Sequence, residues 1–428
     1  MDSNKIIVLI YLAAWVITFL FYYRKNKKFD SGCFIMATYI VYALSSYLLY
    51  NTKYIVFSPL PLKVFPFIYL FLMLLVGLLP ILRFRTASNV TIQQPSMSLL
   101  NVFCCIFIFS TLIHFPSAIV DVADGFSKIM YSSTGGMELY EETLDANADA
   151  GHSISNLAAV VSNAFAQVGF LLTIYYLTLD NKSRWVTIGL FISCLMKMLN
   201  GVATGQRGAI VEPLLVMAAT FFLLKDYMKP VYKKIALRIG VVLVILLSIP
   251  VAFITISRFD NSVSDPLEST YYYLGVENIN FNNYALDDNG IRYGDRTVPL
   301  FKRMVGFKNV PKNFFERREK YPHLKINDNS FITYVGDIAI DYGPYSTVII
   351  IIVLSLLFVR TTKIRNKEYK FHQLLLVHFW LYLCVIGGVK LFPYADTGGN
   401  LKIIVMIISY FIFKNDCYKH KRSISYAQ

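Results

Sequence analysis

The feature that most constrains this chain is a series of long apolar runs separated by short polar connections. Most of these runs approach the roughly 20 residues that an α-helix needs to cross the hydrocarbon core of a bilayer. Unpaired backbone groups are costly in lipid, so apolar runs of this length fold as transmembrane helices. Of the 428 residues, 56% are hydrophobic and only 16% are charged, which excludes an ordinary soluble protein of two or three domains.

The runs predict an all-α fold with about eleven transmembrane helices, forming a single polytopic membrane domain over residues 1–428. The expected spans are 6–23, 33–50, 64–82, 98–115, 154–179, 185–202, 210–224, 235–256, 345–359, 371–392 and 401–413. The first run is not a cleavable signal peptide, because its charges follow the apolar core instead of preceding it.

The positions of the basic residues predict the orientation of the chain. Arg24, Lys25, Lys27 and Lys28 directly follow the first run, and about half of the 41 lysines and arginines fall in alternate short loops and the tail. Basic residues concentrate in cytoplasmic loops, so we expect the amino terminus outside and the carboxyl terminus in the cytoplasm. The net charge of +14 therefore reflects topology and predicts no nucleic-acid partner.

One polar segment is much longer than the other connections. Residues 257–332 are expected to form a large outer loop between two membrane helices, and long loops commonly carry recognition or chemistry. Between residues 291 and 325, about ten basic residues accompany three acidic ones. Such a run is often a solvated face, and the alternative is an anion site at the membrane surface.

Two arginines strengthen the anion-site interpretation. Arg207 and Arg258 each lie where an apolar run meets the expected outer surface, level with lipid headgroups. A guanidinium group can bond two phosphate oxygens at once, which suits it to this position. Gly205 and Gly208 flank Arg207 and allow the backbone to turn tightly.

A row of polar residues marks one face of the 154–179 helix and the segment before it. His152, Asn156, Asn163 and Gln167 are spaced so that they share this face. Polar residues in a membrane helix face protein or water, not lipid. The row therefore indicates either hydrogen bonding between helices or the wall of a polar cavity.

Metal and nucleotide motifs are missing from the sequence. The six cysteines show no metal-ligand spacing and no disulfide framework in the long loop. There is no Walker-type phosphate loop, no HExxH and no GxSxG. No inner loop is long enough for the cytoplasmic domain of a sugar-nucleotide glycosyltransferase.

Several short motifs follow one another in a fixed order: Gly205, Arg207 and Gly208, then Arg258, then Asn329-Ser330-Phe331 and Asp341-Tyr342-Gly343. This ordered combination resembles the bacterial O-antigen polymerases, the Wzy-type polymerases of oligosaccharide repeat units. The resemblance spans roughly residues 200–354. It departs from the family pattern at Tyr342, where the family usually has Phe, and in having only one loop histidine.

The resemblance implies a metal-independent, cofactor-free glycosyltransferase on the periplasmic face of the bacterial inner membrane. Its substrates would be undecaprenyl-diphosphate-linked oligosaccharides for O-antigen, capsule or exopolysaccharide synthesis. Its other partners would be membrane lipid and a chain-length regulator protein. The growing glycan would be transferred to the incoming lipid-linked repeat unit.

The resemblance also assigns residue roles. Arg207 and Arg258 would bind the diphosphate, with Arg292 and Arg296 as helpers. Asp341 is the first choice for the base, followed by His323 and Asp328. Asp341 has a structural alternative as a cap for the helix that starts at Pro344.

Two other classes of function remain open. An O-antigen ligase, which joins glycan to lipid A, is the closest alternative within the enzymes. A polysaccharide flippase or transporter would also be polytopic and basic, but it would more often show paired halves and short outer loops.

Overall fold

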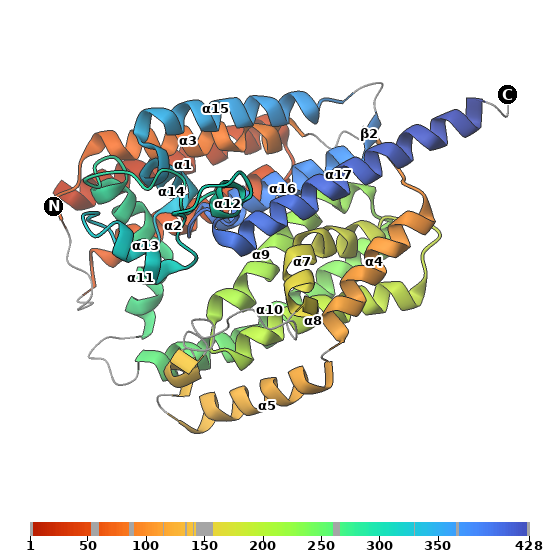
Figure 1. Cartoon of the computed structure of the whole chain (residues 1–428), viewed down its shortest axis with the longest axis horizontal. Helices are drawn as coiled ribbons and strands as arrows, with labels where there is room; N and C mark the ends of the chain where they lie inside the picture. The colour runs from red at the N-terminus through yellow and green to blue at the C-terminus, as the bar shows by residue number, and fades with distance from the viewer. Residues whose placement is uncertain are drawn as a thin grey trace. The chain divides into compact units, whose positions relative to one another are not determined.

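The computed structural model describes residues 3–52, 60–84, 90–113, 115–132, 135–139, 141–142, 157–259, 266–328, 330–364 and 368–425 (Figure 1). The chain divides into two compact units. Unit 1 comprises Met1–Gln94 and Thr270–Gln428, and unit 2 comprises Pro95–Ser269. Apart from two short strands, the regular elements of the described residues are helices, so the predicted all-α class is confirmed.

Unit 1 contains the first three and the last two of the membrane-length helices, together with one shorter apolar helix. Its elements before the division are α1 (Ser3–Asn26), α2 (Ser31–Leu49), α3 (Val64–Arg83) and β1 (Thr91–Gln93). Its last elements are α15 (Pro344–Thr361), β2 (Glu368–Lys370), α16 (Phe371–Gly387) and α17 (Asp396–Ser425). The short strands β1 and β2 pair in parallel, a feature that the sequence did not predict.

Helix α16 forms the core of unit 1, because almost every residue along it is buried. Such an all-round apolar helix is typical of a buried position. Two hydrogen bonds fix it to its neighbours: the Tyr39 hydroxyl of α2 donates to the Cys384 carbonyl at 2.8 Å, and the Trp380 indole donates to the Gly77 carbonyl of α3 at 2.6 Å. Helix α15 lies along the other side of α3 (Figure 1).

Unit 2 is a bundle of membrane-length helices, one shorter apolar helix and one surface helix. Its elements are α4 (Met97–Leu112), α5 (Phe115–Tyr131), α7 (Leu157–Tyr176), α8 (Arg184–Ala203), α9 (Arg207–Leu224), the short turn η2 (Lys225–Tyr227) and α10 (Pro230–Phe259). Helix α8 packs against α4, α5, α7 and α9. Gly205, with φ of 61°, makes the tight turn between α8 and α9.

The structure bears out much of the predicted series of spans. Within the described ranges, nine helices are long and apolar enough to cross a membrane. The other two expected spans coincide with shorter apolar helices, α4 and α16. Helix α16 ends at Gly387, before the expected end at residue 392, and α17 begins at Asp396, before the expected start at 401.

The described part of the expected outer loop is folded and partly helical. Helix α10 extends to Phe259, and the following elements are α11 (Pro266–Asn280), the π-helical turn η3 (Phe281–Ala285), α12 (Pro299–Met304), α13 (Phe314–Lys320) and α14 (Thr333–Tyr342). Residues 270–342 of this stretch belong to unit 1 and are called the outer segment below.

Close backbone contact joins the outer segment to α2. A Cβ atom at Gly275 of α11 would lie 2.4 Å from the backbone nitrogen of Ser46, so only glycine fits there. The Ser46 hydroxyl donates to the Gly275 carbonyl at 2.7 Å across the same contact.

Candidate functional site

Unit 1 buries a group of ionised side chains, here called the arginine–aspartate cluster. All but one of its members belong to the outer segment, and the last begins α17. Its members are Arg292, Arg296, Arg317, Asp328, Asp337, Asp341 and Asp396.

Local structure brings the first members together. Asp337 and Asp341 are four residues apart in α14, so they share one face of that helix. The turn before α12 is fixed against this face by hydrogen bonds from two backbone amides. The Arg292 amide donates to the Ile340 carbonyl at 2.9 Å, and the Thr297 amide donates to Asp341 Oδ2 at 2.7 Å.

Arg292 is the centre of the cluster. Its Nη2 donates to Asp337 Oδ1 at 2.7 Å and lies 3.1 Å from the Asp337 carbonyl oxygen. Its Nε forms an ion pair with Asp341 Oδ1 at 2.7 Å, and its Nη1 bonds Asp328. The guanidinium is only 2% exposed and faces three carboxylates.

The other two arginines extend the cluster. Arg296 donates from Nε to Asp337 Oδ2 at 3.0 Å, and its Nη1 lies 3.0 Å from Asp328 Oδ2. Arg317 of α13 donates from Nε to the same Asp328 oxygen and from Nη1 to Asp396 Oδ1 at 2.7 Å. Asp328 is therefore shared by three arginines.

The carboxylates of the cluster differ in pKa. Burial favours the neutral form of Asp328, but Arg296, Arg292 and Arg317 outweigh it and lower the pKa to about 2. Burial raises the pKa of Asp341 above its ordinary value, against the opposing effect of Arg292. A raised pKa suits a general base, although Asp341 is fully buried.

A second group of charges adjoins the cluster through Tyr321. The buried carboxylate of Asp295 accepts from Lys302 and, at 2.7 Å, from Lys320. The Tyr321 hydroxyl lies 2.8 Å from Asp295 Oδ2 and 3.0 Å from the Arg292 carbonyl oxygen. These contacts join α12 and α13 into one folded unit.

The cluster has little free space. The cavity between Arg292, Arg317 and Tyr321 has a volume of about 10 Å³, which is room for about one water molecule. To bind a diphosphate, Arg292 and Arg296 would have to exchange carboxylate partners for phosphate oxygens. Their assignment as helpers stays a prediction.

His323 lies apart from the arginine–aspartate contacts. Its side chain is exposed, packs edge-on near the Tyr321 ring, and closely approaches Gly290. Its predicted role as a base stays a prediction. In the described part of the chain, no group of three His, Cys, Asp or Glu side chains is placed to hold a metal ion.

Arg207 occupies the first turn of α9 in unit 2. It is 8% exposed, and its Nη1 donates to the Thr255 hydroxyl of α10 at 3.2 Å. Position 258 lies three residues further along α10, while the Arg258 side chain is outside the described residues. Arg207 begins α9, position 258 is near the end of α10, and these two helices pack together. The two positions therefore lie at the same end of the helix pair.

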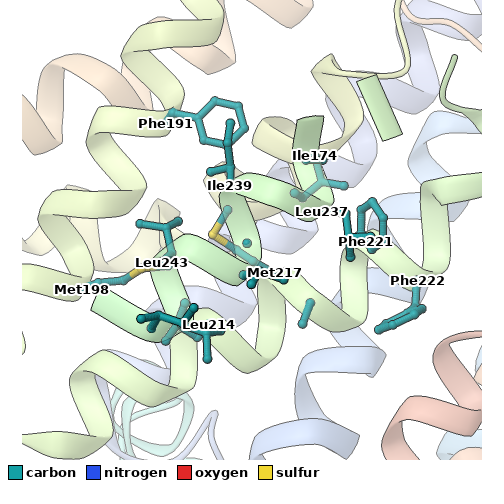
Figure 2. Close-up of a pocket in the computed structure, with 16 residues that line it drawn as sticks. Ile174, Phe191, Met198, Leu214, Met217, Phe221, Phe222, Leu237, Ile239 and Leu243 are labelled. Atoms are coloured by element: carbon teal, nitrogen blue, oxygen red, sulfur yellow. The ribbon is translucent and has the colours of Figure 1, made fainter. Parts of the chain in front are cut away.

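An apolar groove runs between α7, α8, α9 and α10. Its volume is about 290 Å³ (Figure 2). The labelled side chains in Figure 2 are aliphatic, aromatic or methionine, with no nitrogen or oxygen atoms among the drawn sticks. Leu214 lies seven residues after Arg207, so the groove begins about 10 Å along α9 from the arginine.

A polar cavity occupies the other side of unit 2. It has a volume of about 300 Å³ and is lined by α4, α5, α7, α8 and α9. Asn163, one of the polar residues predicted to share a face of the 154–179 helix, lines it and accepts a hydrogen bond from Lys197 at 2.6 Å. Gln167 is buried, whereas His152 and Asn156 lie outside the described residues.

The structure distributes the predicted site residues between the two units. Arg292, Arg296, Asp328 and Asp341 meet in the arginine–aspartate cluster, whereas Arg207 and Arg258 belong to unit 2. Asp341 contacts the turn before α12, and Gly343 stands at the cap position of α15, so the capping alternative for Asp341 is not what the structure shows.

The sequence analysis missed three cluster members, Arg317, Asp337 and Asp396. The spacing of four between Asp337 and Asp341, matched by that between Arg292 and Arg296, was a usable signal for one of them. Arg317 and Asp396 are 79 positions apart and gave no local signal.

Comparison with protein-family models, with curated proteins and with solved structures found no match to this chain. Sequence similarity therefore contributes nothing to the assignment beyond the short motifs. Helix length and hydropathy identify the chain as a multi-pass, all-α membrane protein.

Proposed function

We propose that the protein polymerises lipid-diphosphate-linked oligosaccharide repeat units on the outer face of a bacterial inner membrane. One observation carries the proposal: the buried Arg207 is bonded to Thr255 at one end of α9 and α10, and an apolar groove of about 290 Å³ between the same helices begins about 10 Å further along α9. A cation and an apolar groove on the same helices match a ligand with an anionic head and a long hydrocarbon tail.

The chemistry of the transfer explains the need for arginine. A hydroxyl of the incoming repeat unit attacks the anomeric carbon that links the growing glycan to its carrier. The bond to the lipid diphosphate breaks, and negative charge develops on the leaving phosphate oxygen. Preoriented guanidinium donors stabilise that charge without a metal ion. Arg207 and Arg258 are proposed for this role.

The proton of the attacking hydroxyl must go to a base. Asp341, Asp328 and His323 remain the proposed candidates. The raised pKa of Asp341 favours it over Asp328, whose pKa is about 2 and which would accept a proton poorly at neutral pH.

The surface glycan of a strain that lacks the protein tests the proposal. Loss of a polymerase leaves single repeat units attached to lipid A. Loss of a ligase leaves polymer on the carrier lipid, and loss of a flippase leaves neither product outside. Full-length surface glycan in the deletion strain, or either of the other two patterns, would reject polymerisation.

One observation favours the transporter alternative. Glu277 of α11 is fully buried beside α1 and α2, and burial raises its pKa well above the ordinary value. Its Oε1 accepts from the Asn278 amide at 2.9 Å, and Asn278 in turn contacts Tyr11 and Ser46. A buried carboxyl group with a raised pKa can take up and release a proton, as proton-coupled transporters require. A flippase predicts the third outcome of the deletion test.

A further inference from the structure

The turn after α12 carries three large apolar side chains that are exposed. Met304 is 68% exposed, Val305 is 78% exposed and Phe307 is 59% exposed. Residues 304–307, which also include Gly306, are called the apolar tip below. Single apolar residues are common on protein surfaces, but a contiguous group of large ones marks a contact with another protein or with a membrane.

Hydrogen bonds hold the apolar tip in a defined turn. The Gly306 amide donates to the Arg303 carbonyl at 3.0 Å, and the Phe307 amide donates to the Lys302 carbonyl at 3.1 Å. Gly306 has φ of 99°, so these two bonds form the Schellman motif that ends α12. The Lys302 ammonium lies 5.5 Å from the centre of the Phe307 ring. The turn therefore presents its apolar side chains on the surface in one arrangement.

The apolar tip lies beside the outer end of a membrane helix. Helix α12 packs against α17, in which Asp396–Asp416 is a candidate membrane span (Figure 1). Arg303 donates from Nη2 to the Thr397 hydroxyl at 2.5 Å, and the Leu300 amide donates to Asn400 Oδ1 at 3.0 Å. Thr397 is the second residue of α17, at the end that the basic residues assign to the outer side. The apolar tip directly follows Arg303, so it lies near the depth at which this span leaves the bilayer.

The charges around the apolar tip are basic. Residues 302–312 contain four basic residues and no acidic one. Of the four, Lys302 is paired with Asp295, whereas Lys308 and Lys312 are exposed. Basic residues beside exposed apolar side chains are typical of segments that lie in the interface of an anionic membrane. Lipid is also the partner that surrounds the end of every membrane span, so the position and the charge favour lipid over a second protein.

We propose that the apolar tip inserts into the outer leaflet of an anionic phospholipid membrane, with Lys308 and Lys312 at the lipid phosphates. Met304, Val305 and Phe307 then lie among the upper parts of the acyl chains, where their apolar surface is removed from water. The contact fixes the outer segment, which carries most of the arginine–aspartate cluster, against the bilayer. The inference does not depend on the proposed function, because it concerns the surrounding lipid and not a substrate.

Fluorescence quenching at the apolar tip tests the proposal. The full-length protein without its native cysteines carries Val305→Cys labelled with bimane, in nanodiscs of phosphatidylglycerol with lipids spin-labelled on the upper acyl chain. The matched control carries the same label at Glu319→Cys, an exposed and charged position of α13. The spin-labelled lipid should quench the label at 305 about twofold or more strongly than the label at 319, as expected for an inserted segment. Equal quenching at the two positions would overturn the proposal.

Two comparisons test the anionic character of the lipid. Quenching at position 305 should be weaker in phosphatidylcholine than in phosphatidylglycerol. Lys308→Gln combined with Lys312→Gln should weaken it in phosphatidylglycerol, because each lysine near an anionic surface strengthens binding about fivefold. Lys234→Gln, which removes an exposed lysine of α10, should leave it unchanged. Equal quenching in the two lipids, or unchanged quenching in the double variant, would overturn the proposal.

Iodide, a quencher that stays in water, distinguishes the other possible surroundings of the apolar tip. Iodide should quench the label at position 305 less than the label at position 319. Quenching at 305 by iodide but not by spin-labelled lipid would show that the apolar tip stays in water. Protection from both quenchers would show that a protein surface covers it, such as a second copy of this chain. Either result would overturn the proposal. The replaced side chains are all exposed, so these variants do not disturb the core.

Discussion

Replacing Arg292 by alanine should open the outer segment of the protein. Arg292 is the partner of Asp328, Asp337 and Asp341, and none of these carboxylates is more than 9% exposed. Removing one partner of a buried ion pair typically costs about 3–5 kcal/mol, because the remaining charge stays buried without compensation. This exceeds the roughly 0–1 kcal/mol expected for a surface pair.

The assay is the rate of thiol labelling at a buried reporter in the outer segment. Ala339 of α14 is 1% exposed, so Ala339→Cys in a background without the native cysteines should react only when the segment opens. A loss of 3 kcal/mol or more corresponds to labelling about a hundredfold faster or more in Arg292→Ala. Adding Asp341→Asn to Arg292→Ala should recover part of the protection, since it removes one uncompensated carboxylate.

Arg318→Ala is the matched control. Arg318 lies next to Arg317 in α13 but is exposed, and its Nη1 donates to the Ile326 carbonyl at 3.5 Å. Its loss should change the labelling rate by less than about threefold. If Arg292→Ala and Arg318→Ala label at the same rate, the cluster does not stabilise the outer segment.

Three further predictions test other parts of the structure. The pKa of Asp328 is about 2 in the folded protein, below the ~3.9 of an unfolded aspartate. The ionised carboxylate therefore stabilises the fold above about pH 4, and this stabilisation is lost as the pH falls toward 2. A rate of reporter labelling that does not change between about pH 4 and about pH 2 would contradict this. Gly275→Ala should lower the free energy of unfolding by about 1–3 kcal/mol, because the new Cβ would lie 2.4 Å from Ser46 N. In the control Gly240→Ala, the new Cβ meets nothing within 4 Å, so this variant should be neutral. Equal melting temperatures for the two variants would reject the close contact. Asn309→Cys should react with a membrane-impermeant thiol reagent in intact spheroplasts, and labelling only after lysis would invert the topology.

The membrane helices were the predictable part of the fold. Their hydropathy survives without tertiary information, so the expected spans matched helices that the structure describes. Boundaries were less predictable where turn-forming residues decide them. Helix α16 stops at Gly387, with Gly388 as its cap and Pro393 soon after, although apolar residues continue to 392.

The outer segment was not predictable as a folded unit. Helix α13 has only seven residues, too few to be stable on its own, and it is fixed by ion pairs from Arg317 to Asp328 and Asp396. The sequence also did not show that the charges of the outer segment compensate one another, because residues 291–325 by themselves contain an excess of basic residues. The compensating carboxylates of Asp337 and Asp396 lie outside that window.

The candidate site was predictable only in part. The buried position of Arg207 at a helix start agrees with the expectation of an arginine at the end of an apolar run. Its contact with Thr255 and the apolar groove depend on how α9 and α10 pack, which the sequence does not state. The polar cavity was foreseen as one of two interpretations of the row that contains Asn163.

Reconstitution tests the proposed function most directly. Purified protein in proteoliposomes, given lipid-diphosphate-linked repeat units, should produce a ladder of longer lipid-linked glycans. Arg207→Ala should lower the rate about a hundred- to a thousandfold, and Arg207→Lys should recover it only partly, because lysine keeps the charge but loses the two-pronged geometry. Arg238→Ala, which removes an exposed arginine of α10, should leave the ladder unchanged. No ladder from the folded wild-type protein, or a full ladder from Arg207→Ala, would contradict the account.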